Sequence, residues 1–123
     1  MDNAGTYFIG RANGIAKARG WFFGSFMDEP LLRSDLVEVA WQPIPNVVPQ
    51  AKENHFHRES VEINMVVSGS LCVAINGTEY HLSTGEFYVV WPLTTVQVLS
   101  SDAEAALIVV RAPSLPHDKY LVQ

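Results

Sequence analysis

Short β-rich runs separated by turn residues constrain the fold of this chain more than any other feature of its sequence. From Leu36 onward, branched and aromatic residues gather in runs about 8 to 12 residues apart, the spacing typical of all-β sandwiches and barrels. We expect strands near 36–41, 54–58, 61–67, 71–75, 79–82, 87–91, 95–99 and 105–111. The predicted fold class is therefore all-β.

Turn residues between these runs give the prediction a physical basis. Asn76-Gly77 is the strongest hairpin signal, because both residues tolerate the positive φ that a tight turn requires. Ser68-Gly69-Ser70 and Ser83-Thr84-Gly85 have the same character, and three prolines predict a loop over 42–53. Only the segment 10–19 is compatible with a short helix.

The length and composition fit one globular domain. The chain has 123 residues, of which 48% are hydrophobic and 17% charged, so it is long enough to bury a core and unlike a disordered tail. We expect a single domain over 1–123. It would comprise an N-terminal arm of short strands and turns (1–35), a barrel (36–112) and a C-terminal tail (113–123).

Charge and hydropathy argue against two classes of partner. The formal net charge of −5 leaves no basic stripe that could follow a phosphate backbone, so we expect no nucleic acid partner. No apolar run approaches the roughly 20 residues of a membrane helix, and the N-terminus lacks the features of a secretory signal. Cys72 is the single cysteine and is expected to be buried as a small hydrophobe. We therefore expect a cytoplasmic protein without a membrane partner.

Metal-ligating residue types concentrate in the segment 54–62. Alternate side chains in a strand share a face, so His55 and His57 should point the same way and lie close enough to bind one ion. A carboxylate from the next strand would complete a 2-His-1-carboxylate face, which suits Fe(II) and accommodates Mn, Ni or Zn. Glu62 is the favoured carboxylate. Glu59, which shares the parity of the histidines but should lie at the turn, is the alternative.

These residues resemble the first conserved motif of the cupin superfamily. The motif is carried by His55-x-His57, four residues, Glu62, six residues and Gly69. One position departs from it, because the family usually has a glycine where this chain has Pro49. The resemblance implies a double-stranded β-helix, or jelly-roll barrel, with a metal ion inside it and frequent dimerisation.

The run from Gly85 to Pro92 is similar to the second cupin motif, a Gly-Asp/Glu turn followed by an apolar strand and a proline. Members with a complete site carry a histidine shortly after this proline, where the chain has Gln97. The resemblance implies a metal site made of the two histidines, Glu62 and Gln97. Because an amide oxygen is a weaker and harder donor than imidazole, we expect one divalent ion, with Fe(II) or Mn(II) ahead of Ni and Zn.

Other polar and aromatic residues are candidates for the barrel interior. Small-molecule sites are mostly apolar with a few polar anchors, and the pocket candidates on this basis are Asn64, Trp41, Trp91 and Arg58. Arg33 and Arg111 are further candidate anchors for a carboxylate or phosphate. The aromatic residues of 21–26 would wall the pocket, close the barrel or build a dimer seam. His81 and His117 are expected at the surface.

Two classes of function remain open. The first, which we favour, is a metal-dependent enzyme acting on a small molecule, with chemistry of the dioxygenase, isomerase or cyclase type that the resemblance implies. The second is a non-catalytic cupin that binds or senses a sugar or another metabolite. No catalytic residue is assigned. In either case we expect a homodimer, since so small a barrel has strand edges and apolar surface to cover.

Overall fold

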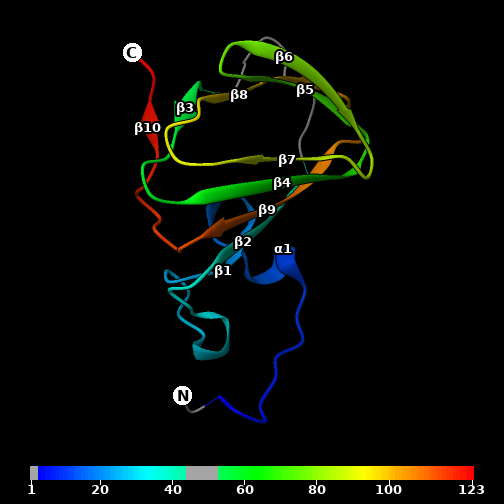
Figure 1. Ribbon diagram of the computed structural model, residues 1–123. Helices are drawn as coiled ribbons and strands as arrows, with labels where there is room; N and C mark the ends of the chain where they lie inside the picture. The colour runs from blue at the N-terminus through cyan, green and yellow to red at the C-terminus, as the bar shows by residue number, and fades with distance from the viewer. Residues whose placement is uncertain (1–2, 44–52) are drawn as a thin grey trace.

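The computed structural model describes residues 3–43 and 53–123, and strands in this part of the chain form two five-stranded antiparallel sheets (Figure 1). Sheet A has the order β1 (Trp21–Phe23), β2 (Glu38–Pro43), β9 (Ala106–Ala112), β4 (Val61–Ser68) and β7 (Phe87–Val90). Sheet B has the order β10 (Tyr120–Leu121), β3 (His55–Phe56), β8 (Val96–Ser101), β5 (Ser70–Ile75) and β6 (Thr78–Ser83). The all-β jelly-roll prediction is confirmed.

Among the residues that the structure describes, helical structure is short and lies between residues 12 and 32. It consists of α1 (Ala12–Ile15) and the 3₁₀ turns η1 (Ala18–Gly20) and η2 (Pro30–Leu32). The segment 10–19, which is compatible with a short helix, begins at Gly10, contains Gly14 and is followed by Gly20, and a glycine in a helix interior costs about 1 kcal/mol relative to alanine. Among the described residues, no helix is long and apolar enough to cross a membrane.

The observed strands follow the predicted runs, with two additions. The arm contributes β1, which pairs with β2, and the C-terminal tail contributes β10, which pairs with β3. These strands of three and two residues are too short to show a period in the sequence. The predicted loop over 42–53, Pro49 included, lies mostly outside the described residues.

The hairpin between β5 and β6 forms at the predicted dipeptide. Asn76 and Gly77 have φ angles of 49° and 83°, the left-handed region that a tight two-residue turn requires at both positions. The carboxamide of Asn76 also accepts the backbone N–H of Thr95 at 2.9 Å. The turn is thereby tied to the chain that leads into β8.

The inner face of sheet A changes from polar to apolar along its strands. One row across β2, β9, β4 and β7 contains Glu38, Arg111, Glu62 and Val90. The next row contains Ala40, Val109, Asn64 and Tyr88. Beyond it the two sheets bury the apolar core, which includes Val66, Leu71, Val73 and Leu107. The polar row closes one end of this core, and there the two histidines of the sequence motif approach it.

The outer faces of the two sheets differ in chemistry. On sheet A, two adjacent rows contain only apolar side chains: Val39, Val110, Ile63 and Val89, then Trp41, Ile108, Met65 and Phe87. Phe87 is 58% exposed. The corresponding face of sheet B carries Ser70, Cys72, Ala74, Glu79, His81, Ser83, Gln97 and Ser100. Cys72 is buried there, as predicted, and its thiol lies 3.7 Å from Glu79.

Candidate metal centre

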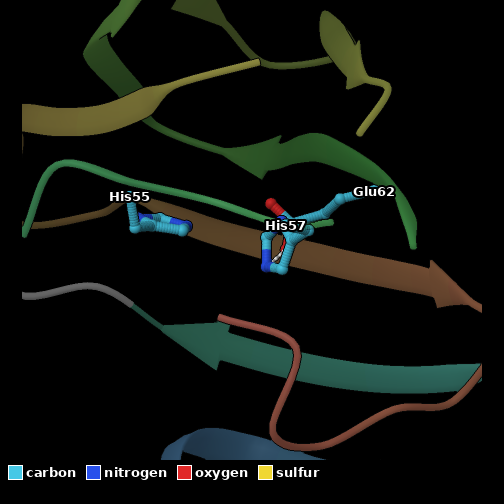
Figure 2. Close-up of side chains that lie close together, drawn as sticks. All are labelled: His55, His57 and Glu62. Atoms are coloured by element: carbon cyan, nitrogen blue, oxygen red, sulfur yellow. Dashed lines mark ion pairs between the residues drawn. The ribbon is translucent and has the colours of Figure 1, made fainter. Parts of the chain in front are cut away.

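Three candidate ligands converge between the sheets at the polar end of the core. His55 lies on β3 opposite Val96 of β8, and Glu62 lies on β4 between Arg111 of β9 and Val90 of β7. His57 follows β3 directly. One possible ligand atom from each of His55, His57 and Glu62 lies within 4.8 Å of the others (Figure 2). The group includes Glu62 and not Glu59, as the favoured prediction stated.

His57 is more deeply buried than His55. Its side chain is 2% exposed, and its Nε2 lies 3.7 Å from Oε2 of Glu62. Nε2 has no hydrogen-bond partner among the described residues, which is costly for a buried nitrogen. Burial lowers the pKa of His57 to about 4, and the attraction of Glu62 only partly opposes this. The ring is therefore neutral near pH 7, the form that binds a metal ion.

His55 is oriented by a backbone contact. Its Nδ1 lies 2.9 Å from the carbonyl oxygen of Glu53. A carbonyl only accepts, so the neutral ring carries its proton on Nδ1 and keeps a lone pair on Nε2. Burial lowers the pKa of His55. Its ring and that of His57 are edge to face, with centroids 5.3 Å apart.

Glu62 has partners on both carboxylate oxygens. Nε of Arg111 donates to Oε2 at 2.5 Å, and the amide of Asn64 donates to Oε1 at 2.9 Å. Burial alone would raise the pKa of Glu62, but the positive charge of Arg111 and the hydrogen bonds from Arg111 and Asn64 hold it below its usual value. Glu62 is thus an ionised carboxylate, held in one orientation beside two neutral imidazoles.

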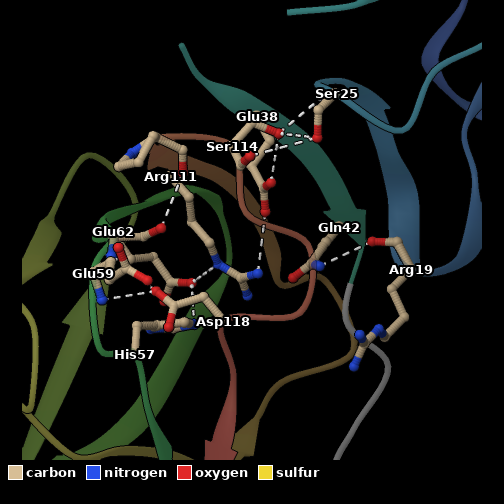
Figure 3. A network of polar contacts seen from close by, with 12 residues as sticks. Arg19, Ser25, Glu38, Gln42, His57, Glu59, Glu62, Arg111, Ser114 and Asp118 are labelled. Carbon is tan, nitrogen blue, oxygen red and sulfur yellow. Dashed lines mark hydrogen bonds and ion pairs between the residues drawn. The ribbon is translucent and has the colours of Figure 1, made fainter. Parts of the chain in front are cut away.

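Arg111 connects Glu62 to a second buried carboxylate. Its Nη1 lies 3.3 Å from Oε2 of Glu38, which is 1% exposed (Figure 3). Its guanidinium lies 4.6 Å from the ring centroid of Trp21. The hydroxyl of Ser114 donates to the other oxygen of Glu38 at 2.8 Å. Arg111, a candidate substrate anchor in the sequence, is engaged by the protein itself, and Trp21 closes the core beside it.

Asp118 closes the turn between the histidines and Glu62. Its carboxylate accepts the backbone N–H groups of Arg58, Glu59 and Ser60, each at 2.9 Å. Burial would raise the pKa of Asp118, but these three hydrogen bonds hold it below its usual value. The tail that carries Asp118 therefore belongs to the site structurally. Sequence reasoning missed it, because the partners are about 60 residues away.

Gln97, the expected fourth ligand, does not point toward this group. Val96 pairs with His55 and is 1% exposed in the core, whereas Gln97 pairs with Ala74 on the adjoining strand. Because successive side chains in a strand alternate between faces, Gln97 lies on the outer face of sheet B. Val96 has the position beside His55 that the motif suggested for Gln97.

The pocket candidates divide between the two sides of the sheet. Asn64 is buried against Glu62 as its parity predicted. Trp41 lies on the outer face of sheet A, opposite Ile108, and Trp91 is 68% exposed. Arg58 is exposed and stacks over the ring of Tyr120. These last three do not line the interior.

The remaining charged and ring residues of the sequence prediction lie at the surface. Arg33 is exposed and reaches the carbonyl of Asp28, and His81 and His117 are exposed as expected. One interior residue was not considered. Tyr88 neighbours Asn64 on the inner face of sheet A, and burial raises the pKa of its hydroxyl strongly, so this group stays protonated. An interior tyrosine on a predicted apolar strand could have been noted from parity with Val90.

Comparison with known proteins supports the architecture. A sequence model described as "Cupin domain" matches residues 46–110. A conserved protein with a double-stranded β-helix domain from Klebsiella pneumoniae superposes with a TM-score of 0.69, at 18% identity over 95% of this chain and 98% of that one. A protein from Planctomyces limnophilus gives 0.69, at 21% identity over 96% and 99%. No curated protein matches by sequence.

A further similar structure has a described activity. Streptomyces Pac13, described as a nucleoside dehydratase, superposes with a TM-score of 0.63, at 17% identity over 73% of this chain and 71% of that one. Related structures of the same protein were solved with uridine. At these identities the likeness concerns the fold alone.

Proposed function

This chain belongs to the cupin domain family, and from that premise we propose that it is a metal-dependent enzyme acting on a small molecule, with the ion held by His55, His57 and Glu62. One observation supports this above all. Nε2 of His57 is buried and neutral, and among the described residues it has no hydrogen-bond partner. A bound cation would satisfy this atom, and the ionised Glu62 supplies the compensating charge.

Two imidazoles and one carboxylate form a donor set that suits Fe(II) with open positions, so Fe(II) is the ion we propose, with Mn, Ni and Zn as the alternatives. Such an ion supplies Lewis acidity toward an oxygen atom of a substrate. Arg111 and Asn64 hold the carboxylate of Glu62 in place. That constraint reduces the reorganisation required on binding.

The protonated hydroxyl of Tyr88 supports a reaction class. A group that keeps its proton throughout the physiological range can donate a hydrogen bond to a substrate oxygen, and it is neither a base nor an efficient general acid. A donor near a Lewis acid suits isomerisation, cyclisation or elimination, in which charge develops on a substrate oxygen. Dehydration by the similar Streptomyces protein is an example of elimination. Oxygenation is the second reaction class, and oxygen consumption would distinguish it.

A non-catalytic binding or sensing role is the second candidate function. The observation in its favour is that both oxygens of Glu62 are already hydrogen-bonded, while apolar Val96 lies beside His55. A site with three ligands holds an ion less tightly than a site with four, and here the carboxylate of Glu62 is also hydrogen-bonded to Arg111 and Asn64. In that case the inner polar groups would recognise a sugar or another small metabolite.

We also infer that the protein is a homodimer whose interface is the apolar outer face of sheet A. An apolar face without charged side chains can pair with the same face of a second copy, as an isologous interface requires. Exposed Tyr7 and Ile9 lie on the N-terminal arm, which extends away from the sheets in Figure 1 and offers further apolar surface to a second copy.

Metal content tests the proposed function directly. Purified protein should contain about one transition-metal ion per chain, and the double change His55→Ala and His57→Ala should abolish it without unfolding the barrel. His81→Ala, which removes an exposed imidazole on β6, is the matched control and should retain the metal. Equal metal in all three proteins by elemental analysis would contradict the proposal. Turnover and oxygen uptake with candidate substrates would then separate the reaction classes.

A further inference from the structure

The segment that carries both histidines has few contacts with the rest of the barrel. β3 is two residues long, and it pairs with β8 only through His55 and Val96. The residues from His57 to Ser60 belong to no strand. Apart from the hydrogen bond that Leu93 donates to the carbonyl of His57 at 2.7 Å, this turn receives little backbone support from the barrel strands around it.

The C-terminal tail supplies the support on the other side. Tyr120 and Leu121 of β10 pair with Phe56 and His55, and the N–H of Val122 donates to the carbonyl of Asn54 at 3.0 Å. A further backbone contact comes from earlier in the tail, where the carbonyl of Pro113 accepts the hydroxyl of Ser60 at 2.9 Å. The tail therefore contacts the histidine segment along most of its length.

Side chains strengthen the same contact. The ring of Tyr120 stacks on that of Phe56 with centroids 5.6 Å apart, and the guanidinium of Arg58 lies 4.5 Å from the Tyr120 ring centroid. Lys119 forms an ion pair with Glu53 at 3.5 Å. Lys119 and Tyr120 thus both have a partner in or next to the histidine segment.

Asp118 makes the most specific of these contacts. Three consecutive N–H groups, of Arg58, Glu59 and Ser60, converge on its two oxygens. The side chain is almost fully buried, and so is that of Ser60. Three successive donors on one carboxylate fix the path of the turn, and that turn alone separates His57 from the strand that carries Glu62.

We propose that Asp118 is a positioning residue for the metal centre: by fixing the turn 58–60 it sets the separation of His57 from Glu62. This inference rests on the proposed function. Asp118 does not touch the ligand atoms, and it acts through the backbone between them. The C-terminal tail is accordingly required for metal affinity, beyond its contribution to the stability of the fold.

Two variants separate geometry from charge. Asp118→Asn keeps the shape but replaces one acceptor oxygen with a donor, which cannot face a backbone N–H. Asp118→Glu keeps the negative charge and displaces the carboxylate by one methylene. The matched control is Asp102→Asn: Asp102 also accepts a backbone N–H, from Glu104 at 3.0 Å, and its carboxylate accepts the hydroxyl of Ser70, the first residue of β5.

Ni(II) affinity, measured by calorimetry on metal-free protein, is the first readout. Both Asp118 variants should bind about tenfold more weakly than the wild type, the low end of the range for residues that orient ligands, and Asp102→Asn should be unchanged. If Asp118→Glu binds Ni(II) as tightly as the wild type, the weaker binding of Asp118→Asn comes from the lost negative charge and not from lost positioning. The inference is then wrong. Equal affinity of all four proteins would also overturn it while leaving the proposed function intact.

Hydrogen exchange in the metal-free proteins is the second readout. The amides of residues 58, 59 and 60 should exchange faster in both Asp118 variants, with the amides of the β4–β9 ladder unchanged. Unchanged exchange at all three amides would refute the inference even if no protein binds metal, an outcome that would separately refute the proposed function. A variant that loses protection throughout the barrel would show a global role for Asp118 and would equally overturn the local one.

Discussion

Val96 illustrates how one residue position decides the composition of a site. After Pro92 the chain turns through Leu93, which has a φ of 72°, and enters β8 so that Val96 faces the core and pairs with His55. Counting residues from the proline suggested Gln97. Counting cannot show how a turn distributes its residues between loop and strand, and a shift of one residue moves a side chain to the opposite face.

Substitution by histidine at each position tests this arrangement. Val96→His places an imidazole beside His55 and should tighten metal retention, because imidazole is a strong donor to a late divalent ion. Gln97→His should leave metal affinity unchanged, since its side chain lies on the outer face of sheet B. Competition with a chelator on both proteins measures the difference. Tighter binding in Gln97→His alone would mean that Gln97 is a ligand after all.

Sequence reasoning found the His55, His57 and Glu62 group because all three lie within one short segment, where strand parity can be counted. It could not find the partners of Glu62 and Glu38. Arg111 is 49 residues from Glu62 and 73 from Glu38, and nothing in the local pattern specifies such pairings. The sequence therefore predicted the contacts within the segment 55–62 and not the contacts between residues far apart in the chain.

At the scale of elements, Arg111 joins the inner faces of three strands. It extends from β9 and contacts carboxylates on β2 and β4, so one cation neutralises two buried charges. Breaking a buried ion pair by removing one partner leaves an uncompensated charge in the interior. The inner face of the sheet therefore carries paired charges at this end and apolar side chains at the other.

Removal of the guanidinium should be correspondingly costly. Arg111→Met is expected to lower the free energy of unfolding by about 3 to 5 kcal/mol, because Glu38 and Glu62 stay buried without a cation. Arg33→Met, at an exposed arginine, should change it by less than about 0.5 kcal/mol. Urea denaturation of the metal-free proteins gives both values. A loss below about 1 kcal/mol for Arg111→Met would show that the carboxylates find another partner or become protonated.

Most strands could be predicted from the sequence, whereas β1 and β10 could not. β4, β5, β6 and β9 have six to eight residues each, enough for alternation and flanking turns to be recognised. β1 and β10 exist only because a neighbouring strand offers an edge. Both lie next to the candidate site. Trp21 of β1 contacts Arg111, and β10 pairs with the strand that carries His55.

At the scale of the whole molecule, the contrast between the two outer faces predicts the assembly. Met65→Glu combined with Phe87→Glu introduces two charges into one apolar row of sheet A, on β4 and the edge strand β7, and we expect it to convert a dimer into a monomer of 13.6 kDa. His81→Glu on the outer face of sheet B is the control and should leave the dimer intact. Light scattering at micromolar concentration measures the mass. A monomeric wild-type protein would contradict the proposal at once.

The hydrogen bonds of Asp118 also have a consequence for the order of events during synthesis. The chain is made from its N-terminus, so the turn at Arg58 leaves the ribosome 60 residues before the carboxylate that caps it. At about 5 to 20 residues per second, this is a delay of roughly 3 to 12 seconds. Throughout that interval the two histidines are outside the ribosome, but Asp118, which caps the turn beside them, has not yet emerged. The support that Asp118 gives to the candidate metal ligands is consequently complete only after the tail has emerged, and an ion that meets the nascent chain earlier meets imidazoles without that support.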